Sequence, residues 1–300
     1  MEALRVIGVD VGGTKTLAAV VNESGEIEEQ VLRATEQSSQ EALLAELDAM
    51  VDELRAGREI AALGFGLPSR IDQRLGRAVA SVNIPLAEID FRDRMRRQHG
   101  LPVGIDNDAN AATMGEWHAG AAKGARFVVM LTLGTGVGGG LILDGRPYRG
   151  TTGVGAELGH IVIGRDGPPC GCGGHGHLES YATGRVADAT ARRLYGEESD
   201  GHELVVKAKA GDAQAVEALA EIGRWLGAGI ASLVNVFEPQ LVVIGGGFGA
   251  SAGELLLGPA REVLAVEGLV PARDTVRVVQ AELGFYAGVI GAAMVGFEAL

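Results

Sequence analysis

The chain has 300 residues, of which 47% are hydrophobic and 22% are charged, and it carries a formal net charge of −13. The composition is that of a folded globular protein, and the negative charge excludes the basic surface that binds nucleic acid or an anionic membrane. The sequence contains neither a signal-peptide pattern nor an apolar run of the roughly 20 residues that cross a bilayer, and it has only two cysteines, so we expect a cytoplasmic protein.

The first 120 residues predict strands that alternate with helices. An apolar β-rich run is interrupted by Gly12 and Gly13 and then resumes, which is typical of two strands joined by a tight turn. Apolar residues recur at helical spacing further on, and Gly57 can end that helix. The elements expected after the strand pair are a helix over 40–57, strands over 61–66 and 102–108, and a helix over 109–120.

The rest of the chain repeats this plan, with a second glycine-linked strand pair and then alternating helices and strands. We therefore expect two similar α/β domains, one of residues 1–118 joined by the C-terminal helix 286–300 and one of residues 119–285. The elements expected in the second part are strands over 126–134 and 138–145, a helix over 212–237, a strand over 240–247, a helix over 252–266, a strand over 274–281 and a helix over 285–297.

The segment DVGGTKT at 10–16 has the composition of a phosphate-binding turn. Its two glycines let backbone amides approach a phosphate, its threonines add hydroxyl donors, and Asp10 at the end of a strand can hold Mg²⁺ through water. It is not a Walker A loop, because the spacing differs and a strand follows rather than a helix. The alternative is an ordinary hairpin turn.

The segment LGTGVGGG at 133–140 places Gly134, Gly136 and Gly139 in the G-x-G-x-x-G spacing of dinucleotide-binding proteins. That motif requires a helix directly after it, whereas the residues that follow here are typical of a strand that turns at Asp144. We therefore reject the dinucleotide interpretation and predict a second glycine hairpin, and two such turns could hold a polyphosphate from both sides.

The segment DNDAN at 106–110 lies at a predicted junction of strand and helix, where ligands of α/β proteins usually bind. Asp108 is the better candidate for a general base, and Asn107 can form a hydrogen bond with a hydroxyl group. The alternative is purely structural, because Asp and Asn are also the commonest helix caps.

The segment CGCGGHGHLES at 170–180 contains both cysteines and two of the six histidines. The spacing of Cys170 and Cys172 would strain a disulfide between them and differs from that of thioredoxin-like redox sites. Two thiolates and two imidazoles suit tetrahedral Zn²⁺, with His160, His175 and His177 competing for the nitrogen positions, and four protein ligands would make the zinc structural. The alternative is a surface loop with free cysteines.

Taken together, these motifs resemble the ROK family of repressors, open reading frames and kinases, within the superfamily of sugar kinases, actin and heat-shock chaperones. The resemblance runs from Val9 to about Gly291 and implies two ribonuclease H-like domains with a cleft between them. It implies an ATP-dependent hexose kinase, in the first place a glucokinase that makes glucose 6-phosphate. The segments that carry it, in the family's order, are DVGGTKT, GFGLP, DNDANAATMGE, LGTGVGGG, GAELGHI, CGCGGHGHLE and VVIGGG.

The resemblance also implies roles for individual residues. Asp108 would be the base that takes the proton of the sugar hydroxyl, with Mg²⁺ near Asp10. The residues implied in sugar binding are Ser69, Asn83, Asn107, Asp108, Glu157, His160 and Glu179. Those implied around ATP are Asp10, Gly12, Gly13, Thr14, Lys15, Gly134, Thr135, Gly136, Gly246 and Gly247. The implied ligands of a structural zinc are His160, Cys170, Cys172 and His177.

Two segments depart from the family's pattern. The zinc motif usually has a cysteine where this chain has His177, but an imidazole keeps a nitrogen donor, so we expect zinc to be retained, with His175 as the competing ligand. The loop GLPSRID has Ser69 and Arg70 after the proline, where the family usually has glycine first. Asn83 in VNIPL fits the asparagine that glucose-phosphorylating members place on the sugar.

Alternative functions follow from the same resemblance. Members of the family phosphorylate N-acetylmannosamine, mannose or fructose, and a polyphosphate donor is less compatible with the Cys-x-Cys loop. A sugar-sensing regulator would have a DNA-binding domain before Asp10, where nine residues stand, and a non-catalytic sugar-binding protein would not need Asp108. The resemblance favours a homodimer or homotetramer.

Overall fold

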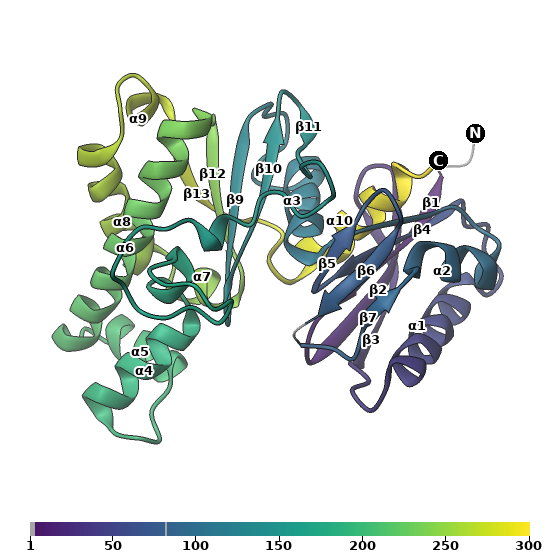
Figure 1. The fold of residues 1–300 in the computed structure, drawn as a ribbon, viewed down its shortest axis with the longest axis horizontal. Coiled ribbons are helices and arrows are strands. Elements are labelled where there is room, and N and C mark those ends of the chain that lie inside the picture. The colour runs from purple at the N-terminus through teal and green to yellow at the C-terminus, as the bar shows by residue number, and fades with distance from the viewer. Residues whose placement is uncertain (1–3, 82) are drawn as a thin grey trace. The chain divides into compact units, whose positions relative to one another are not determined.

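The computed structural model describes residues 4–81 and 83–300 and confirms the predicted α/β class (Figure 1). No helix within these ranges is both long and apolar enough to cross a membrane. The chain divides into two compact units, each with a five-stranded sheet. The first unit comprises Met1–Gly124, Pro147–Ala156 and Phe285–Leu300, and the second comprises Ala125–Arg146 and Glu157–Gly284.

The first unit includes two segments that the predicted division gave to the second domain. Its extension beyond residue 118 contains the end of a helix and the turn after it, which folds back because Ala122 N–H donates to the Glu116 carbonyl at 3.0 Å. The segment 147–156 belongs to it because Gln73 N–H donates to the Thr152 carbonyl at 2.9 Å. The second of these connections joins residues far apart in the sequence, which a composition-based boundary cannot detect.

The large sheet of the first unit has the strand order β3-β2-β1-β4-β8. Strands β1, β2 and β3 pair antiparallel, whereas β1, β4 and β8 run parallel. The pair β1 and β2 is the predicted one, but β3 was not predicted, because none of its residues is buried. The strands are β1 (Arg5–Val11), β2 (Lys15–Asn22), β3 (Ile27–Ala34), β4 (Ala62–Leu67) and β8 (Val103–Asn107).

Helix α1 (Gln40–Arg55) is the predicted first helix. It begins where the Ser39 hydroxyl accepts a hydrogen bond from Ala42 N–H, which satisfies one of the free amides of its first turn. Its apolar residues form the core of this unit together with Ile7 and Val9 of β1. Because side chains alternate along a strand, Gly8 between them faces the other side of the sheet.

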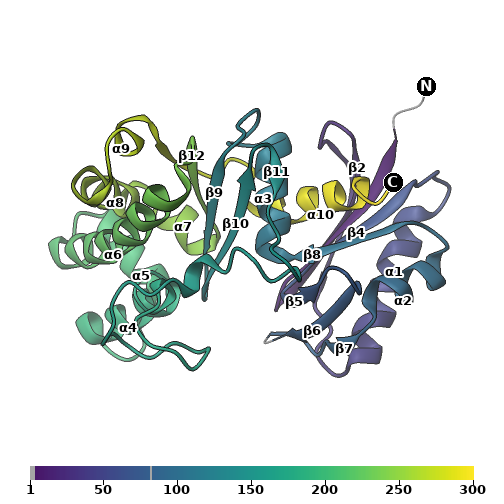
Figure 2. The same cartoon turned by 45° about the horizontal axis from the view of Figure 1, so that its top comes forward.

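Helix α10 (Ala287–Phe297) packs on that other side, where glycines of three neighbouring strands stand in register. Gly8 pairs with Gly64, and Gly64 pairs with Gly104. A Cβ atom at Gly64 would lie 1.8 Å from the Ala292 carbonyl oxygen of α10, so only glycine allows this close approach. α1 and α10 therefore cover opposite faces of the sheet, as Figure 2 shows.

A second, antiparallel sheet of three short strands was not predicted from the sequence. It follows β4 and is followed in turn by an arginine-rich helix, so it lies close in the chain to the predicted sugar residues. These remaining elements of the first unit are β5 (Ser69–Asp72), β6 (Arg77–Ser81), β7 (Ala87–Ile89), α2 (Phe91–His99) and α3 (Asp108–Ala119).

The sheet of the second unit has the order β11-β10-β9-β12-β13, which is the strand plan of the first unit repeated. Its strands are β9 (Val128–Leu133), β10 (Val137–Leu143), β11 (Arg146–Pro147), β12 (Leu241–Gly245) and β13 (Arg277–Gln280). Its helices are α4 (Gly184–Tyr195), α5 (Gly201–Lys209), α6 (Ala213–Phe237), α7 (Gly247–Ala252), α8 (Glu254–Glu267) and α9 (Ala272–Thr275), and single 3₁₀ turns lie at Leu158–His160, Leu178–Ser180 and Gly284–Tyr286.

Candidate functional site

Asp10 lies at the end of β1, opposite Gly66 of the parallel strand β4. Its carboxylate packs against the start of α10, where a Cβ atom at Gly288 would come within 2.2 Å of Asp10 Oδ2. Burial and, to a lesser extent, the negative charge of Asp108 raise the pKa of Asp10 to about 7. An ionised carboxylate is therefore costly here unless a cation lies beside it, and hard oxygen ligands of this kind fit Mg²⁺.

The turn between β1 and β2 is held by side chains from another part of the chain. Gly12 N–H donates to the Lys15 carbonyl at 3.0 Å and closes the turn. The Thr35 hydroxyl donates to the Gly12 carbonyl at 2.7 Å, and Gln37 Nε2 donates to the Gly13 carbonyl at 2.6 Å. The backbone amides of the turn thus have a fixed geometry. The predicted nucleotide residues on it are Gly12, Gly13, Thr14 and Lys15, of which Thr14 and Lys15 are exposed.

Two of the residues predicted to bind the sugar, Asn83 and Ser69, lie in different environments. Asn83 is exposed and lies beside the turn, because a Cβ atom at Gly13 would be 3.1 Å from Asn83 Cβ, and Gln37 Nε2 donates to the Asn83 carbonyl at 3.2 Å. Ser69 is only 4% exposed, and its hydroxyl donates to the Ala80 carbonyl at 3.0 Å. The Asn83 side chain is thus available to a ligand. The Ser69 hydroxyl is already used in a hydrogen bond between β5 and β6 of the three-stranded sheet.

Asn107 and Asp108 open helix α3. Asn107 Oδ1 accepts hydrogen bonds from the N–H groups of Ala109 at 2.9 Å and Asn110 at 3.4 Å, and its Nδ2 donates to the Ser69 carbonyl at 3.4 Å. Asn107 is therefore the N-cap of α3, as the structural alternative for this segment proposed. Asp108 is the first residue of the helix, and its Oδ1 accepts from Ala109 N–H at 2.9 Å.

The residue before this pair, Asp106, is fully buried and anchors the start of α3. Its Oδ1 accepts from Asn107 N–H at 2.8 Å and from Asn110 Nδ2 at 3.0 Å, while its Oδ2 accepts from Arg149 Nε at 2.5 Å. Arg149 also donates to Glu298 at 2.6 Å. Arg149 was not predicted from the sequence, because it lies 43 positions from Asp106 and belongs to no motif.

In the second unit, β9 and β10 are joined by a glycine hairpin at 134–136, as predicted, and a strand rather than a helix follows it. Gly134 N–H donates to the Gly136 carbonyl at 2.9 Å, and Thr135 at the tip is exposed. Glu179 Oε2 accepts from Val137 N–H at 3.0 Å. Glu179 therefore connects the histidine-containing loop to this hairpin.

Two helices begin beside the hairpin. The first residue of α4, Gly184, donates its N–H to the Gly134 carbonyl at 2.8 Å. Before α7, Gly246 has a φ of +81°, and a Cβ atom there would lie 2.4 Å from the Leu133 carbonyl oxygen. The N-terminus of α4 presents amides that favour an anion. Gly246 and Gly247 were predicted near the nucleotide, whereas Gly184 was missed, because only the fold brings it to Gly134.

A cavity of about 460 Å³ lies in this unit beside α4 and the cysteine-containing loop. Thr135 borders it, and Arg185 and Arg193 of α4 add positive charge. Its volume is within the range of small-molecule sites. Other residues that line it include Cys170, Glu179, Ser180, Thr183, Val186 and Thr190.

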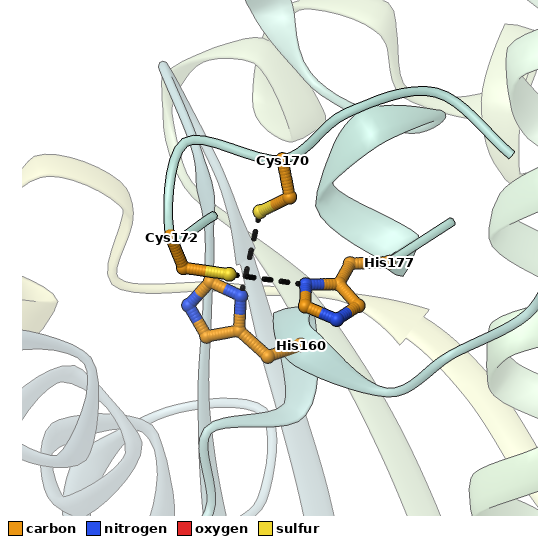
Figure 3. Close-up of side chains that lie close together, drawn as sticks. All are labelled: His160, Cys170, Cys172 and His177. Carbon is orange, nitrogen blue, oxygen red and sulfur yellow. Dashed lines mark hydrogen bonds between the residues drawn. The ribbon is translucent and has the colours of Figure 1, made fainter. Parts of the chain in front are cut away.

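His160, Cys170, Cys172 and His177 form one cluster, with one ligand atom of each within 4.8 Å of the others (Figure 3). Cys170 Sγ lies 3.7 Å from His160 Nδ1, and Cys172 Sγ lies 3.3 Å from His177 Nδ1. In a tetrahedral site, zinc–ligand bonds of about 2.0–2.3 Å place the ligand atoms roughly 3.3–3.8 Å apart. The donor types and these two pair distances fit zinc, while the four ligand atoms together spread over as much as 4.8 Å.

The remaining predicted residues lie around this cluster. His175 is exposed and is not part of it. Glu157 is also exposed, and its carbonyl accepts from His160 N–H at 3.0 Å. Cys170 Sγ lies 3.5 Å from Glu179 Oε1. The structure thus places the Glu179 carboxylate beside the cluster, whereas Glu157 contacts it through its backbone carbonyl.

Comparisons with known proteins agree with this geometry. The ROK family profile matches residues 6–297. A glucokinase from Streptomyces coelicolor is 37% identical over 96% of this chain and 96% of its own length. The crystal structure of a ROK hexokinase from Thermus thermophilus has a TM-score of 0.88 at 35% identity and covers 98% of each chain. A ROK glucokinase from Streptomyces griseus, solved in complex with glucose and AMPPNP, has a TM-score of 0.85 at 35% identity and covers 98% of this chain and 99% of that one. The chain therefore belongs to the ROK family.

Proposed function

We propose that this protein is an ATP-dependent hexose kinase that converts glucose to glucose 6-phosphate. The observation that carries the proposal is the 37% identity to a glucokinase over almost the whole of both chains. The relative solved with glucose and AMPPNP, at 35% identity, supports a sugar and a nucleotide as the two substrates.

Asp108 is the proposed general base. Its carboxylate takes the proton of the sugar hydroxyl while the hydroxyl oxygen forms a bond to the γ-phosphorus of ATP and the bond to ADP breaks. The fold supports this role, because the hydrogen bonds of Asp106 and Asn107 hold the first turn of α3 in place. A base held in this way keeps its position during the reaction.

The residues proposed for sugar binding have side chains that can form hydrogen bonds with hydroxyl groups. Asn83 and Glu157 are exposed and His160 is partly exposed. The Asn107 side chain holds the backbone next to Asp108, whereas the Ser69 hydroxyl is bonded to Ala80 in the small sheet. Glu179 uses one carboxylate oxygen for Val137 N–H and keeps the other near Cys170. Carboxylates, amides and imidazoles of this kind suit a neutral sugar.

The nucleotide would be bound mainly by backbone amides. The turn at 12–15 in the first unit and the hairpin at 134–136 in the second both have glycines that allow a phosphate to approach, and Gly246 and Gly247 would lie against the adenosine. Mg²⁺, when bound near Asp10, would neutralise phosphate charge. An acidic protein can thus bind ATP without a large basic surface.

We further propose that zinc occupies the cluster of His160, Cys170, Cys172 and His177. Four protein ligands fill a tetrahedral site, so the metal would stabilise the loop rather than take part in the reaction. The loop then orders Glu157 and Glu179, which flank the ligands in sequence. This role is consistent with the contact between Cys170 and Glu179.

The use of ATP, and the reduced cysteines that a zinc site needs, favour the cytoplasm and a place in carbohydrate breakdown such as glycolysis. A homodimer or homotetramer stays a prediction, which light scattering of the purified protein tests.

The substrate is tested by a coupled assay that detects ADP. It compares glucose with mannose, fructose, N-acetylglucosamine and N-acetylmannosamine, each with MgATP, and glucose with polyphosphate. We expect the highest kcat/KM for glucose with ATP. A higher value for another sugar would reassign the substrate, and no turnover with any sugar would refute the kinase proposal.

A further inference from the structure

Helix α2 concentrates positive charge in an otherwise acidic chain. It has four arginines within six positions, at 92, 94, 96 and 97, although the chain has a net charge of −13. Arg94 is paired with Asp48. Across residues 4–81 and 83–300, none of the other three has a carboxylate within ion-pair distance, and Arg92 Nη2 donates instead to the backbone carbonyl and the side-chain oxygen of Gln73.

Two of these arginines line a cavity of about 420 Å³ in the first unit. Arg149 is a third guanidinium in its wall, Gln73 contributes an amide, and Glu298 is the one carboxylate. The rest of the wall is formed by Pro102, Val103, Gly104, Ile105, Val295 and Ala299. The wall therefore has three positive charges against one negative charge.

The three guanidinium groups differ in how far they are already engaged. Arg149 binds Asp106 through Nε and Glu298 through Nη2, and its Nη1 has no hydrogen-bond partner among the described residues. Arg96 is exposed and has no hydrogen bond to another described side chain. Donors of Arg96 and Arg149 are thus available to a ligand in the cavity.

The surroundings of Arg92 also favour an anion. Burial lowers the pKa of Arg92, the charge of Asp93 opposes this effect, and the neighbouring charge of Arg96 adds to it. A negative ligand between the two guanidinium groups would remove their repulsion. Guanidinium groups form paired hydrogen bonds with phosphate oxygens, which an isolated ammonium group cannot match.

We propose that this cavity binds a small phosphate-bearing anion through Arg92, Arg96 and Arg149. The ligand is either inorganic phosphate or the monoester of a small polar molecule, and the volume leaves room for the latter. The site contains none of the residues proposed for glucose, ATP or zinc. It is therefore a second ligand site, although Arg149 also contacts Asp106, two residues before the proposed base.

Isothermal titration calorimetry tests this site with two probes, inorganic phosphate and glycerol 3-phosphate. Glucose, AMPPNP and Mg²⁺ are present throughout, so that the proposed substrate sites are occupied. Arg96→Gln removes an exposed arginine from the cavity, and Arg92→Gln removes a half-buried one. Arg97→Gln is the matched control, because Arg97 lies on the same helix and is exposed but does not line the cavity.

We expect the wild-type protein to bind at least one probe with a Kd of about 1 mM or lower. Arg96→Gln should weaken binding about tenfold or more, and Arg97→Gln should change it less than about twofold. Tighter binding of inorganic phosphate would identify the free ion as the ligand, and tighter binding of glycerol 3-phosphate would identify a phosphate monoester. The proposal fails if neither probe binds, if Arg96→Gln binds as the wild type does, or if Arg97→Gln weakens binding equally, since the last result would indicate only a diffuse positive field.

Discussion

Arg149 Nε donates a hydrogen bond to Asp106 Oδ2 at 2.5 Å, and this contact joins the segment after β11 to the start of helix α3. Asp106 has no exposed surface, so its charge depends on Arg149 and on the N–H donors of Asn107 and Asn110. The proposed base Asp108 lies two residues further on. Arg149, which belongs to no sequence motif, thus helps to position the first turn of α3, where the proposed base Asp108 lies.

Arg149→Met should destabilise the protein, because it leaves a buried carboxylate without its charge partner, at a cost of about 3–5 kcal/mol. It should also lower kcat for glucose more than it changes KM, since it displaces Asp108 rather than a binding group. Thermal unfolding and steady-state kinetics measure the two effects, and Arg149→Lys should recover part of both.

Arg126→Gln is the matched control for that variant. Arg126 pairs with Asp144, and both side chains are 67% exposed, so its loss should cost less than about 1 kcal/mol. If Arg149→Met lowered the stability and the kcat no more than Arg126→Gln does, Arg149 would have no positioning role.

Purified protein should contain about one zinc per chain by elemental analysis. Cys170→Ser and His177→Ala should lose it, because each removes one of four ligands. His177→Cys should retain zinc, since a thiolate replaces the imidazole. His175→Ala is the control and should also retain it, because His175 lies outside the cluster.

Zinc removal should unfold the loop before the sheets, since metal binding and local folding are coupled. A wild-type protein that is fully active without metal, or zinc that is lost in His175→Ala but kept in His177→Ala, would contradict the assignment.

Asp10→Asn should make the protein more stable at pH 8 and less active. The pKa of Asp10 is about 7 in the folded protein and 3.8 without burial. Between these values the folded state keeps a proton that the unfolded chain has released, so this group lowers stability as pH rises from about 4 to about 7. Asparagine is not subject to this effect.

Without Mg²⁺ or nucleotide, the melting temperature of Asp10→Asn should exceed that of the wild type at pH 8, and the gain should shrink toward pH 4. Asp166→Asn is the control, because its side chain is 93% exposed. A lower melting temperature of Asp10→Asn at pH 8 would contradict the burial argument.

The sequence predicted the elements whose signal is local. The glycine-interrupted strand pairs and the helix at 213–237 have regular apolar patterns, and three of the four residues of the His and Cys cluster come from eight consecutive positions. Strand β3 was missed, because its partly buried positions include the charged Glu29 and Arg33, so that hydrophobic and polar residues do not alternate along it. The partnership of Arg149 and Asp106 depends on tertiary packing, which no local spacing indicates.

The sequence also could not show whether His175 or His177 lies with the two cysteines, because this depends on the folded backbone. Both follow the cysteines closely, so ligand chemistry alone left them in competition. The backbone decides between them, because His177 directly precedes the 3₁₀ turn at Leu178–Ser180 and reaches Cys172, whereas His175 is exposed.

Asp108 is proposed as the base of an ATP-dependent glucose kinase, and the rate at which Asp108→Ala forms glucose 6-phosphate tests this role. The variant should fold and bind glucose as the wild type does, while kcat falls by roughly 10²–10⁴-fold, the usual contribution of a general base. A folded Asp108→Ala protein that phosphorylates glucose at close to the wild-type rate would contradict the account.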